Sequence, residues 1–298
     1  LTWLNQPEQL ARTLVGRDHV MHALLQGIAA TTQGGPANHV LLVGPRGIGK
    51  THILSLLDHY ASGRLQPPEG FTEALAAWVP VFFSEEEFAG QNSLANFVLT
   101  TMLKLGEAQP QEVLWKLPAD LPAQGDAAIA ECCFDRIRRF HAERGKRLLL
   151  LIDHLQRMLR QWTSDGHDSL RAFLSGQGFV LLIGTAPSVF KEVLSQRAAF
   201  HQFFDIQILH DLSESDTLEF LRRLYREDGR EADFDSRRDE LSRKLPAVLT
   251  LTGGNPRLIL FLYQVASRST FLERASRPTI SRCPVRRSPL EPIRRAAL

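Results

Sequence analysis

The segment HVLLVGPRGIGKTHILSLLDHY, residues 39–60, constrains the fold of this chain more than any other stretch of its 298 residues. It begins with an apolar run of strand length, which is typical of a strand buried on both faces of a parallel sheet. A glycine-rich loop follows, and residues 51–60 then repeat apolar side chains with a helical period. A buried strand that turns through such a loop into a helix predicts an α/β fold.

The loop matches the pattern G-x-x-x-x-G-K-[ST] at every position. Glycines let the backbone wrap closely around phosphates, and the helix that follows adds the positive end of its dipole. Lys50 can reach the β- and γ-phosphates, and the Thr51 hydroxyl can ligate Mg²⁺. The alternative is a merely glycine-rich turn, and the flanking strand and amphipathic helix count against it. We therefore expect phosphate contacts from the loop and the first helical turn: Gly44, Pro45, Arg46, Gly47, Ile48, Gly49, Lys50, Thr51 and His52.

Further strands and helices alternate along the chain and then give way to helices only. The periodicity predicts strands at 78–84, 147–153, 178–187 and 203–209, and helices at 18–30, 93–105, 127–144 and 168–175. Three more helices are expected at 213–228, 235–251 and 255–268. This order predicts a three-layer P-loop α/β core with a parallel sheet, then a small all-α lid, then a basic tail in which disorder is expected: residues 1–211, 212–272 and 273–298.

Polar residues end two of the predicted strands, and an arginine begins one helix. Asp153 ends LLLLID, where its carboxylate can hold Mg²⁺ through water, and Thr185 ends LLIGT, where it can touch the γ-phosphate or a water. Arg257 lies in a first helical turn, which disfavours a cation unless an anion is nearby. The alternative for Asp153 is a residue that only caps the strand end, for Thr185 a turn residue, and for Arg257 a surface arginine. We predict that Thr51 and Asp153 hold the metal, and that Thr185 and Arg257 act on the phosphates.

Hydrolysis also needs a base that orients the attacking water. His154 follows Asp153 directly, and a neutral histidine can polarise water. Glu85, Glu86 and Glu87 follow the strand at 78–84, so their loop should face the same crevice. The alternative for these glutamates is a solvated acidic turn. Glu86 is our candidate for the catalytic base.

The formal net charge of +2 is distributed unevenly. Residues 273–298 contribute +5, which leaves residues 1–272 at −3. A mildly acidic body counts against a protein that binds nucleic acid over its whole surface, although the tail can hold DNA phosphates non-specifically. The abrupt change after residue 268 to unpatterned, Arg/Pro/Ser-rich sequence also allows another interpretation, a read-through or frameshifted end.

The three cysteines, Cys132, Cys133 and Cys283, have neither a disulfide framework nor the spacing of a zinc site. Cys132 and Cys133 are expected to be small core residues of a helix. No apolar run approaches the roughly 18 residues that span a bilayer, and the first residues lack the layout of a signal peptide. These features predict a protein of the reducing cytoplasm with no membrane partner.

The order of the motifs resembles the AAA+ ATPases and their relatives, the STAND signalling ATPases and the archaeal-type and origin-recognition-type ATPases. GPRGIGKT corresponds to Walker A and LLLLID to Walker B. Thr185 matches the position called sensor 1, and TGGNPR at 252–257 is similar to the sensor 2 segment of the helical lid. The likeness covers residues 12–268. It implies ATP and Mg²⁺ as ligands.

The segment LVGRDHVMHALL, residues 14–25, looks like the part of these families that lies near the adenine, which implies that Val15, Gly16 and Arg17 lie there. Two features depart from the family pattern. His154 stands where an acidic residue usually follows the Walker B aspartate, which argues against fast turnover. No clear arginine finger is present, and Arg197, just before the strand expected at 203–209, is the candidate. No recognisable effector domain follows residue 268.

These observations favour an ATP-binding, slowly hydrolysing ATPase module that acts as a nucleotide-dependent switch. Its partners would be another copy of itself or an effector protein. The alternative is a scaffold or DNA-transaction adaptor that binds ATP without useful hydrolysis. A small-molecule or nucleotide kinase is disfavoured, because the expected lid follows the core instead of being inserted in it.

Overall fold

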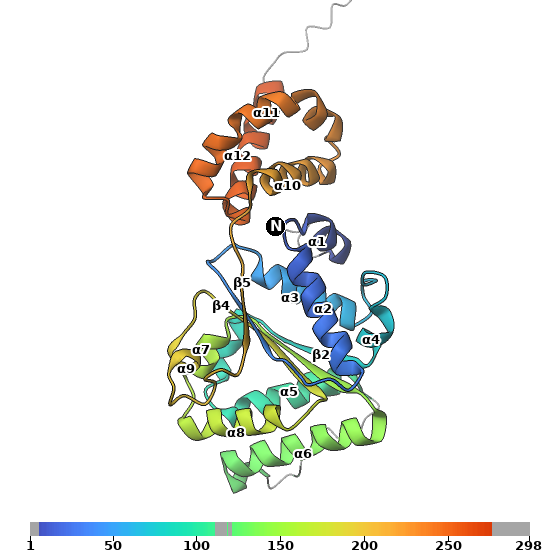
Figure 1. The fold of residues 1–298 in the computed structure, drawn as a ribbon, viewed down its shortest axis with the longest axis vertical. Coiled ribbons are helices and arrows are strands. Elements are labelled where there is room, and N and C mark those ends of the chain that lie inside the picture. Colours follow the sequence, from blue (N-terminus) through green and yellow to red (C-terminus); the bar gives the residue numbers. More distant parts are fainter. Residues whose placement is uncertain (1–5, 111–117, 119–120, 276–298) are drawn as a thin grey trace, which may run out of the picture. The chain divides into compact units, whose positions relative to one another are not determined.

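The computed structural model describes residues 6–110, 118 and 121–275. Its sheet contains five parallel strands in the order β2-β3-β4-β1-β5 (Figure 1). The strands are β1 Val40–Val43, β2 Trp78–Phe83, β3 Arg147–Ile152, β4 Val180–Ala186 and β5 Asp205–Ile208. The predicted parallel sheet is confirmed, and each strand is slightly shorter than the sequence pattern indicated.

Helices cover both faces of the sheet and make three layers. Alternate residues of β3 divide between two cores, with Leu148, Leu150 and Ile152 on one side and Leu149 and Leu151 on the other. The second side is covered by α1 Pro7–Thr13, α2 Asp18–Thr32, α3 Lys50–Ala61 and α4 Thr72–Ala76. The first side is covered by α5 Leu94–Ala108, α6 Asp126–Arg144, α7 Leu155–Leu159, α8 Ser164–Ser175 and α9 Lys191–Leu194.

Several short helices were not predicted, because four to seven residues are too few to show a helical period. These are α1, α4, α7 and α9, and the 3₁₀ turns η2 Glu85–Gly90 and η4 Leu121–Gln124. Three predicted helix starts were wrong, and one of them belongs to the helix expected at 235–251, which begins at Glu231. α8 begins at Ser164, where Thr163 caps it, and α6 is capped by Gly125 with Asp126 as its first residue. Cys133 is buried in α6 and Cys132 is partly buried beside it, as predicted, whereas Cys283 lies outside the described residues.

The region after β5 is helical, as predicted, and consists of α10 Glu214–Glu227, α11 Glu231–Thr252 and α12 Pro256–Ala275. Ser213 and Asp216 form a capping box at the start of α10. Asn255 caps α12, since its Oδ1 accepts a hydrogen bond from the Arg257 N–H at 3.1 Å. α12 continues to Ala275, beyond its predicted end at 268, so the first residues of the predicted tail are helical. The rest of that tail, 276–298, lies outside the described residues.

The chain divides into two compact units, residues 1–260 and 261–298. The first contains the whole sheet, α1 to α11 and the first turn of α12. The described part of the second is the remainder of α12. The predicted boundary between core and lid at residue 212 stays a prediction. No helix among the described residues is long and apolar enough to cross a membrane.

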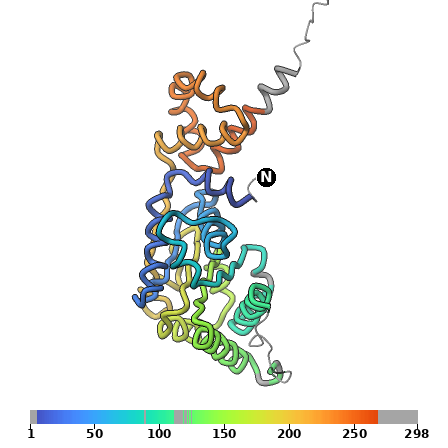
Figure 2. The backbone as a smooth tube through the Cα atoms, turned by 90° about the vertical axis from the view of Figure 1, so that its right-hand side faces the viewer, coloured from blue at the N-terminus to red at the C-terminus, as the bar shows by residue number. Residues whose placement is uncertain are grey.

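Inside the first unit, α1 packs against α10 (Figure 2). Arg223 of α10 donates to the carbonyl oxygens of Arg12 at 3.1 Å and Leu14 at 2.7 Å. The chain start and the part of the predicted lid in this unit, residues 212–260, therefore form adjoining walls beside the sheet.

Candidate nucleotide-binding site

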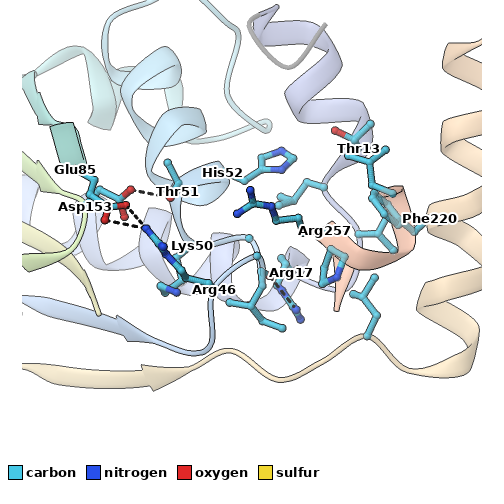
Figure 3. Close-up of a pocket in the computed structure, with 18 of the residues that line it drawn as sticks. Thr13, Arg17, Arg46, Lys50, Thr51, His52, Glu85, Asp153, Phe220 and Arg257 are labelled. Carbon is cyan, nitrogen blue, oxygen red and sulfur yellow. Dashed lines mark hydrogen bonds and ion pairs between the residues drawn. The ribbon is translucent and has the colours of Figure 1, made fainter. Parts of the chain in front are cut away.

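A cavity of about 660 Å³ opens where the glycine-rich loop leaves β1 (Figure 3). This volume lies within the range of small-molecule sites, roughly 300–1,000 Å³. Its walls come from α1, the loop, the ends of β2 and β3, and the helices after β5. They consist of Thr13, Leu14, Val15, Arg17, Arg46, Gly47, Ile48, Gly49, Lys50, Thr51, His52, Glu85, Glu86, Asp153, His154, Leu212, Phe220, Pro256, Arg257 and Leu260.

Strand order brings the polar residues of this cavity together. β3 lies between β2 and β4, so the residues that follow β3 have the ends of both neighbours beside them. The Asp153 N–H donates to the carbonyl of Phe83 at 3.0 Å, which places Asp153 next to the start of η2. On the other side, Ile152 is in register with Gly184, the residue before Thr185. Parallel strands thus converge with their carboxyl ends on one crevice.

Asp153 is hydrogen-bonded on both of its carboxylate oxygens. Thr51 Oγ1 donates to Oδ2 at 2.8 Å, and Thr185 Oγ1 donates to Oδ1 at 2.5 Å. The Thr185 oxygen in turn accepts from the His154 N–H at 2.9 Å. Thr185 is completely buried and is not part of the cavity wall, so in this arrangement it orients Asp153. Direct contact of Thr185 with a γ-phosphate or water stays a prediction.

Lys50 is buried, and its ammonium contacts the backbone of the glycine-rich loop. It donates to the carbonyl oxygens of Gly44 at 2.6 Å and Pro45 at 2.9 Å. Burial lowers the pKa of Lys50; the carboxylate of Asp153 opposes this shift and Arg46 adds to it. A phosphate anion beside the ammonium would favour its charged form.

The three glutamates after β2 have different surroundings. Glu85 accepts hydrogen bonds from Arg46 at 2.9 Å and Arg157 at 2.5 Å, and lies 3.3 Å from His154 Nε2. Glu86 is exposed and lines the cavity. Glu87 accepts from the Ser84 N–H at 2.7 Å and pairs with Lys104 at 2.5 Å, outside the cavity wall. The predicted acidic loop does face the crevice, with Glu85 and Glu86.

His154 has a left-handed backbone conformation, with φ 54°, and caps α7. Its Nδ1 lies 3.3 Å from Gln156 Nε2, an amide nitrogen that can only donate. Gln156 therefore donates to Nδ1, and Nε2 faces Glu85. Both ring nitrogens are then engaged, which leaves neither free to accept a proton from water.

The end of the cavity away from Asp153 is apolar. It is formed by Leu14, Val15, Leu212, Phe220, Pro256 and Leu260. Of these, the sequence predicted only Val15. Phe220 and Leu260 occupy apolar helix positions that look like ordinary core residues, so nothing in the sequence distinguished them. One polar and one apolar end are what phosphates and a base require, respectively.

Two expected contact residues, Arg17 and His52, line the cavity and also make contacts within the protein. The Arg17 guanidinium is buried and donates to the carbonyls of Ile48 at 3.3 Å and His210 at 2.5 Å, which ties the loop to the segment after β5. Burial lowers the pKa of Arg17, against the opposing charges of Asp216 and Asp211. His52 Nε2 contacts the Leu10 carbonyl at 2.6 Å, toward α1. Three further expected contact residues are absent from the cavity wall: Gly44, Pro45 and Gly16.

Arg257 lines the cavity from the first turn of α12 and is exposed. Arg197 is exposed too, but lies outside the cavity wall. Its suggested role as an arginine finger stays a prediction.

A magnesium–triphosphate group fits these residues. No cluster of three or more His, Cys, Asp or Glu that could hold a metal occurs in the described part of the chain. Mg²⁺ in such sites takes one or two protein ligands and completes its octahedron with phosphate oxygens and water. The Thr51 hydroxyl and the Asp153 carboxylate, 2.8 Å apart, meet that requirement.

The fold and the cavity define a P-loop nucleotide-binding module. The chain belongs to the AAA ATPase domain family, whose match covers residues 13–183, more than half of the sequence. It is therefore a nucleotide-binding ATPase module, and the predicted resemblance is confirmed. The comparison with curated proteins found no match.

Solved structures agree with this fold. The Orc1 protein of Aeropyrum pernix in complex with DNA has a TM-score of 0.57 at 16% identity, covering 91% of this chain and 64% of that one. Hsp104 of S. cerevisiae in complex with casein has a TM-score of 0.52 at 16% identity, covering 91% and 41%. At such identities the likeness concerns the fold alone. The chain spans less than two thirds of either protein.

Proposed function

We propose that this chain is an ATP-binding, slowly hydrolysing module that acts as a nucleotide-dependent switch. The observation that carries the proposal is the cavity itself. Its polar end holds Lys50 and the Thr51–Asp153 pair, and its apolar end is closed by residues before and after the sheet. One ligand with a base and a phosphate chain would touch the loop, α1 and the predicted lid together.

Each polar residue then has a role set by its position. Lys50 and the N–H groups of the loop bind the phosphates, and Thr51 and Asp153 hold the magnesium ion. When bound, Mg²⁺ would neutralise phosphate charge. Thr185 keeps the Asp153 carboxylate oriented through its 2.5 Å hydrogen bond. Val15 and the apolar residues near it contact the base.

Slow turnover is supported by the surroundings of the candidate bases. His154 has both ring nitrogens engaged, and Glu85 accepts from Arg46, Arg157 and His154. Glu86 remains the candidate base, because it is exposed at the cavity wall and keeps its lone pairs. An exposed carboxylate on a 3₁₀ turn is not fixed in place, so it would orient water poorly.

The switch rests on the contact between loop and lid. Arg257 and Pro256 line the cavity, and Asn255 Nδ2 donates to the Arg46 carbonyl at 3.0 Å. Loss of the γ-phosphate would change what Arg257 contacts and so shift the lid. The output would be self-association or the binding of an effector protein. The cysteine usage favours a reducing cytoplasm as the place where this happens.

The test is multiple-turnover phosphate release from ATP with Mg²⁺, after nucleotide binding has been measured. Lys50→Ala removes the phosphate-binding ammonium, and Lys244→Ala on the exposed face of α11 is its matched control. Glu86→Gln is compared with Glu131→Gln on α6, where the exposed carboxylate pairs with Arg138 outside the cavity wall. Turnover lost in Lys50→Ala and Glu86→Gln but kept in both controls supports an ATPase with Glu86 as base. Normal ATP binding by Lys50→Ala would overturn the site.

A second function, a scaffold that binds ATP without useful hydrolysis, is favoured by the engaged ring of His154. Tight binding without phosphate release would support it. The DNA-adaptor form of this proposal draws on the Orc1 structure, which contains DNA. Binding of duplex DNA that falls steeply with salt would support that form, and no binding at low salt would exclude it.

A further inference from the structure

Arg46, the third residue of the glycine-rich loop, has its side chain at the polar end of the cavity. Its side chain is 67% exposed, and one guanidinium nitrogen, Nη2, donates to both carboxylate oxygens of Glu85 at 2.9 Å. It lines the cavity together with Lys50, and its partner Glu85 lies 3.3 Å from His154, the residue after Asp153. The arginine therefore lies on the side of the cavity where Lys50 and Asp153 would meet the terminal phosphates.

Glu85 does not depend on Arg46 alone. Arg157 Nη1 donates to Oε1 at 2.5 Å, and His154 Nε2 lies 3.3 Å from Oε2. Burial alone would raise the pKa of Glu85, but the hydrogen bonds from the two arginines and the nearby His154 outweigh it, so the pKa is lowered. The carboxylate stays ionised and would keep two partners if Arg46 left. An exposed ion pair of this kind contributes little to stability, so Arg46 can leave Glu85 at a small cost in free energy.

The backbone of Arg46 is held more firmly than its side chain. The Asn255 amide donates to its carbonyl at 3.0 Å. At the next residue, Gly47 has φ +85°, and a Cβ there would lie 2.7 Å from the Cβ of Arg257. The loop is thus packed directly against the start of α12. A ligand can change the position of the Arg46 side chain without moving the loop.

We propose that Arg46 distinguishes nucleoside triphosphate from diphosphate, by leaving Glu85 to bind the γ-phosphate. The inference rests on the proposed ATP site and adds a specificity-determining residue to it. A planar guanidinium makes bidentate contacts with phosphate oxygens as readily as with a carboxylate, and the more highly charged phosphate attracts it more strongly. A diphosphate leaves Arg46 paired with Glu85.

The test compares the affinities of the full chain for ADP and for the β,γ-imido analogue of ATP, both with Mg²⁺, by calorimetry. In Arg46→Gln the ratio of triphosphate to diphosphate affinity should fall about tenfold, the loss expected for one hydrogen-bonded charge pair. In Glu85→Gln the ratio should rise about threefold, because the competing carboxylate loses its charge. Arg46→Lys should give an intermediate ratio, since it keeps the charge and loses the fork.

An ion pair on α6 supplies matched controls. Arg138 and Glu131 are also 2.9 Å apart and lie outside the cavity wall, so Arg138→Gln and Glu131→Gln should leave the ratio within about twofold of wild type. Equal loss of both affinities in Arg46→Gln would overturn the proposal, as would a lower ratio in Glu85→Gln. If wild-type protein binds neither nucleotide, the proposed function fails and this inference fails with it.

Discussion

Replacing Thr185 by valine tests how the aspartate at the centre of the site is held. The two side chains have nearly the same shape, so the substitution removes a hydroxyl and little else. That hydroxyl is completely buried, donates to Asp153 Oδ1 at 2.5 Å and accepts from the His154 N–H at 2.9 Å. Valine would leave both partners without it.

The expected cost follows from these two contacts. A hydrogen bond to a charged group contributes about 1.5–3 kcal/mol, and a buried N–H left unsatisfied costs about 1–3 kcal/mol. Asp153 keeps its bond from Thr51, which limits the loss. We expect the free energy of unfolding to fall by about 3–4 kcal/mol in Thr185→Val. Thr185→Ser keeps the hydroxyl and loses one methyl group, which should cost about 1 kcal/mol.

Urea unfolding without nucleotide measures both variants. The same preparations can then be titrated with ADP, with and without Mg²⁺. In the proposed site Asp153 holds the metal, so Thr185→Val should lose most of the gain in affinity that Mg²⁺ provides. A valine variant as stable as the serine variant would refute this reasoning. In that case Thr185 does not position Asp153, and direct contact with the γ-phosphate becomes the better explanation of its place in the site.

Three other measurements are informative. Lys50→Ala should weaken ATP and ADP binding about a hundredfold, whereas Asp153→Asn should spare binding without Mg²⁺ and stop Mg²⁺-dependent turnover; equal effects would contradict the assigned roles. Burial lowers the pKa of His39 to about 4, and a hydrogen bond from the ring to the Leu174 backbone opposes this shift. The unfolded chain protonates this histidine near pH 6.5, whereas the folded chain does so only near pH 4. The free energy of unfolding should therefore be highest above pH 6.5 and fall by about 3 kcal/mol between pH 6.5 and 4. Urea titrations of His39→Gln should show a weaker dependence of this free energy on pH. Gly254→Ala should lower the free energy of unfolding, measured with urea, by at least the roughly 1–3 kcal/mol of a strained backbone, because φ is +77° there and a Cβ would lie 2.5 Å from the Leu212 carbonyl oxygen.

Much of the fold was predictable because its signals are local. Buried parallel strands are continuous apolar runs, and all five were found, with ends that differ by one or two residues. Capping residues correctly located the starts of α10 and α12. The short helices were missed, since a single turn has no period to detect. The order of the strands is a different kind of property, because it depends on which buried face packs against which.

The same distinction applies to the site. The sequence predicted site roles for Lys50, Thr51, Asp153 and Arg257, and all four line one cavity. The sequence could not separate Glu85 from its two neighbours, because all three follow one strand in a row. Only the packing shows that Glu85 pairs with Arg46 and Arg157, and that Glu87 turns toward Lys104.

The sequence by itself determined that a phosphate-binding loop joins a buried strand to a helix, and that strands and helices alternate before a helical region. Short-range geometry is enough for this, since the loop pattern and the periods of 2 and 3.6 residues arise within a few neighbouring residues. Only the tertiary structure decided what completes the site. Phe220 and Leu260 reach the cavity from helices far along the chain, and Thr185 lies beside Asp153 because β4 is the neighbour of β3. Hydrophobic patterning marks Phe220 and Leu260 as buried but does not specify which residues they contact. Only the packing of the whole chain determines those contacts.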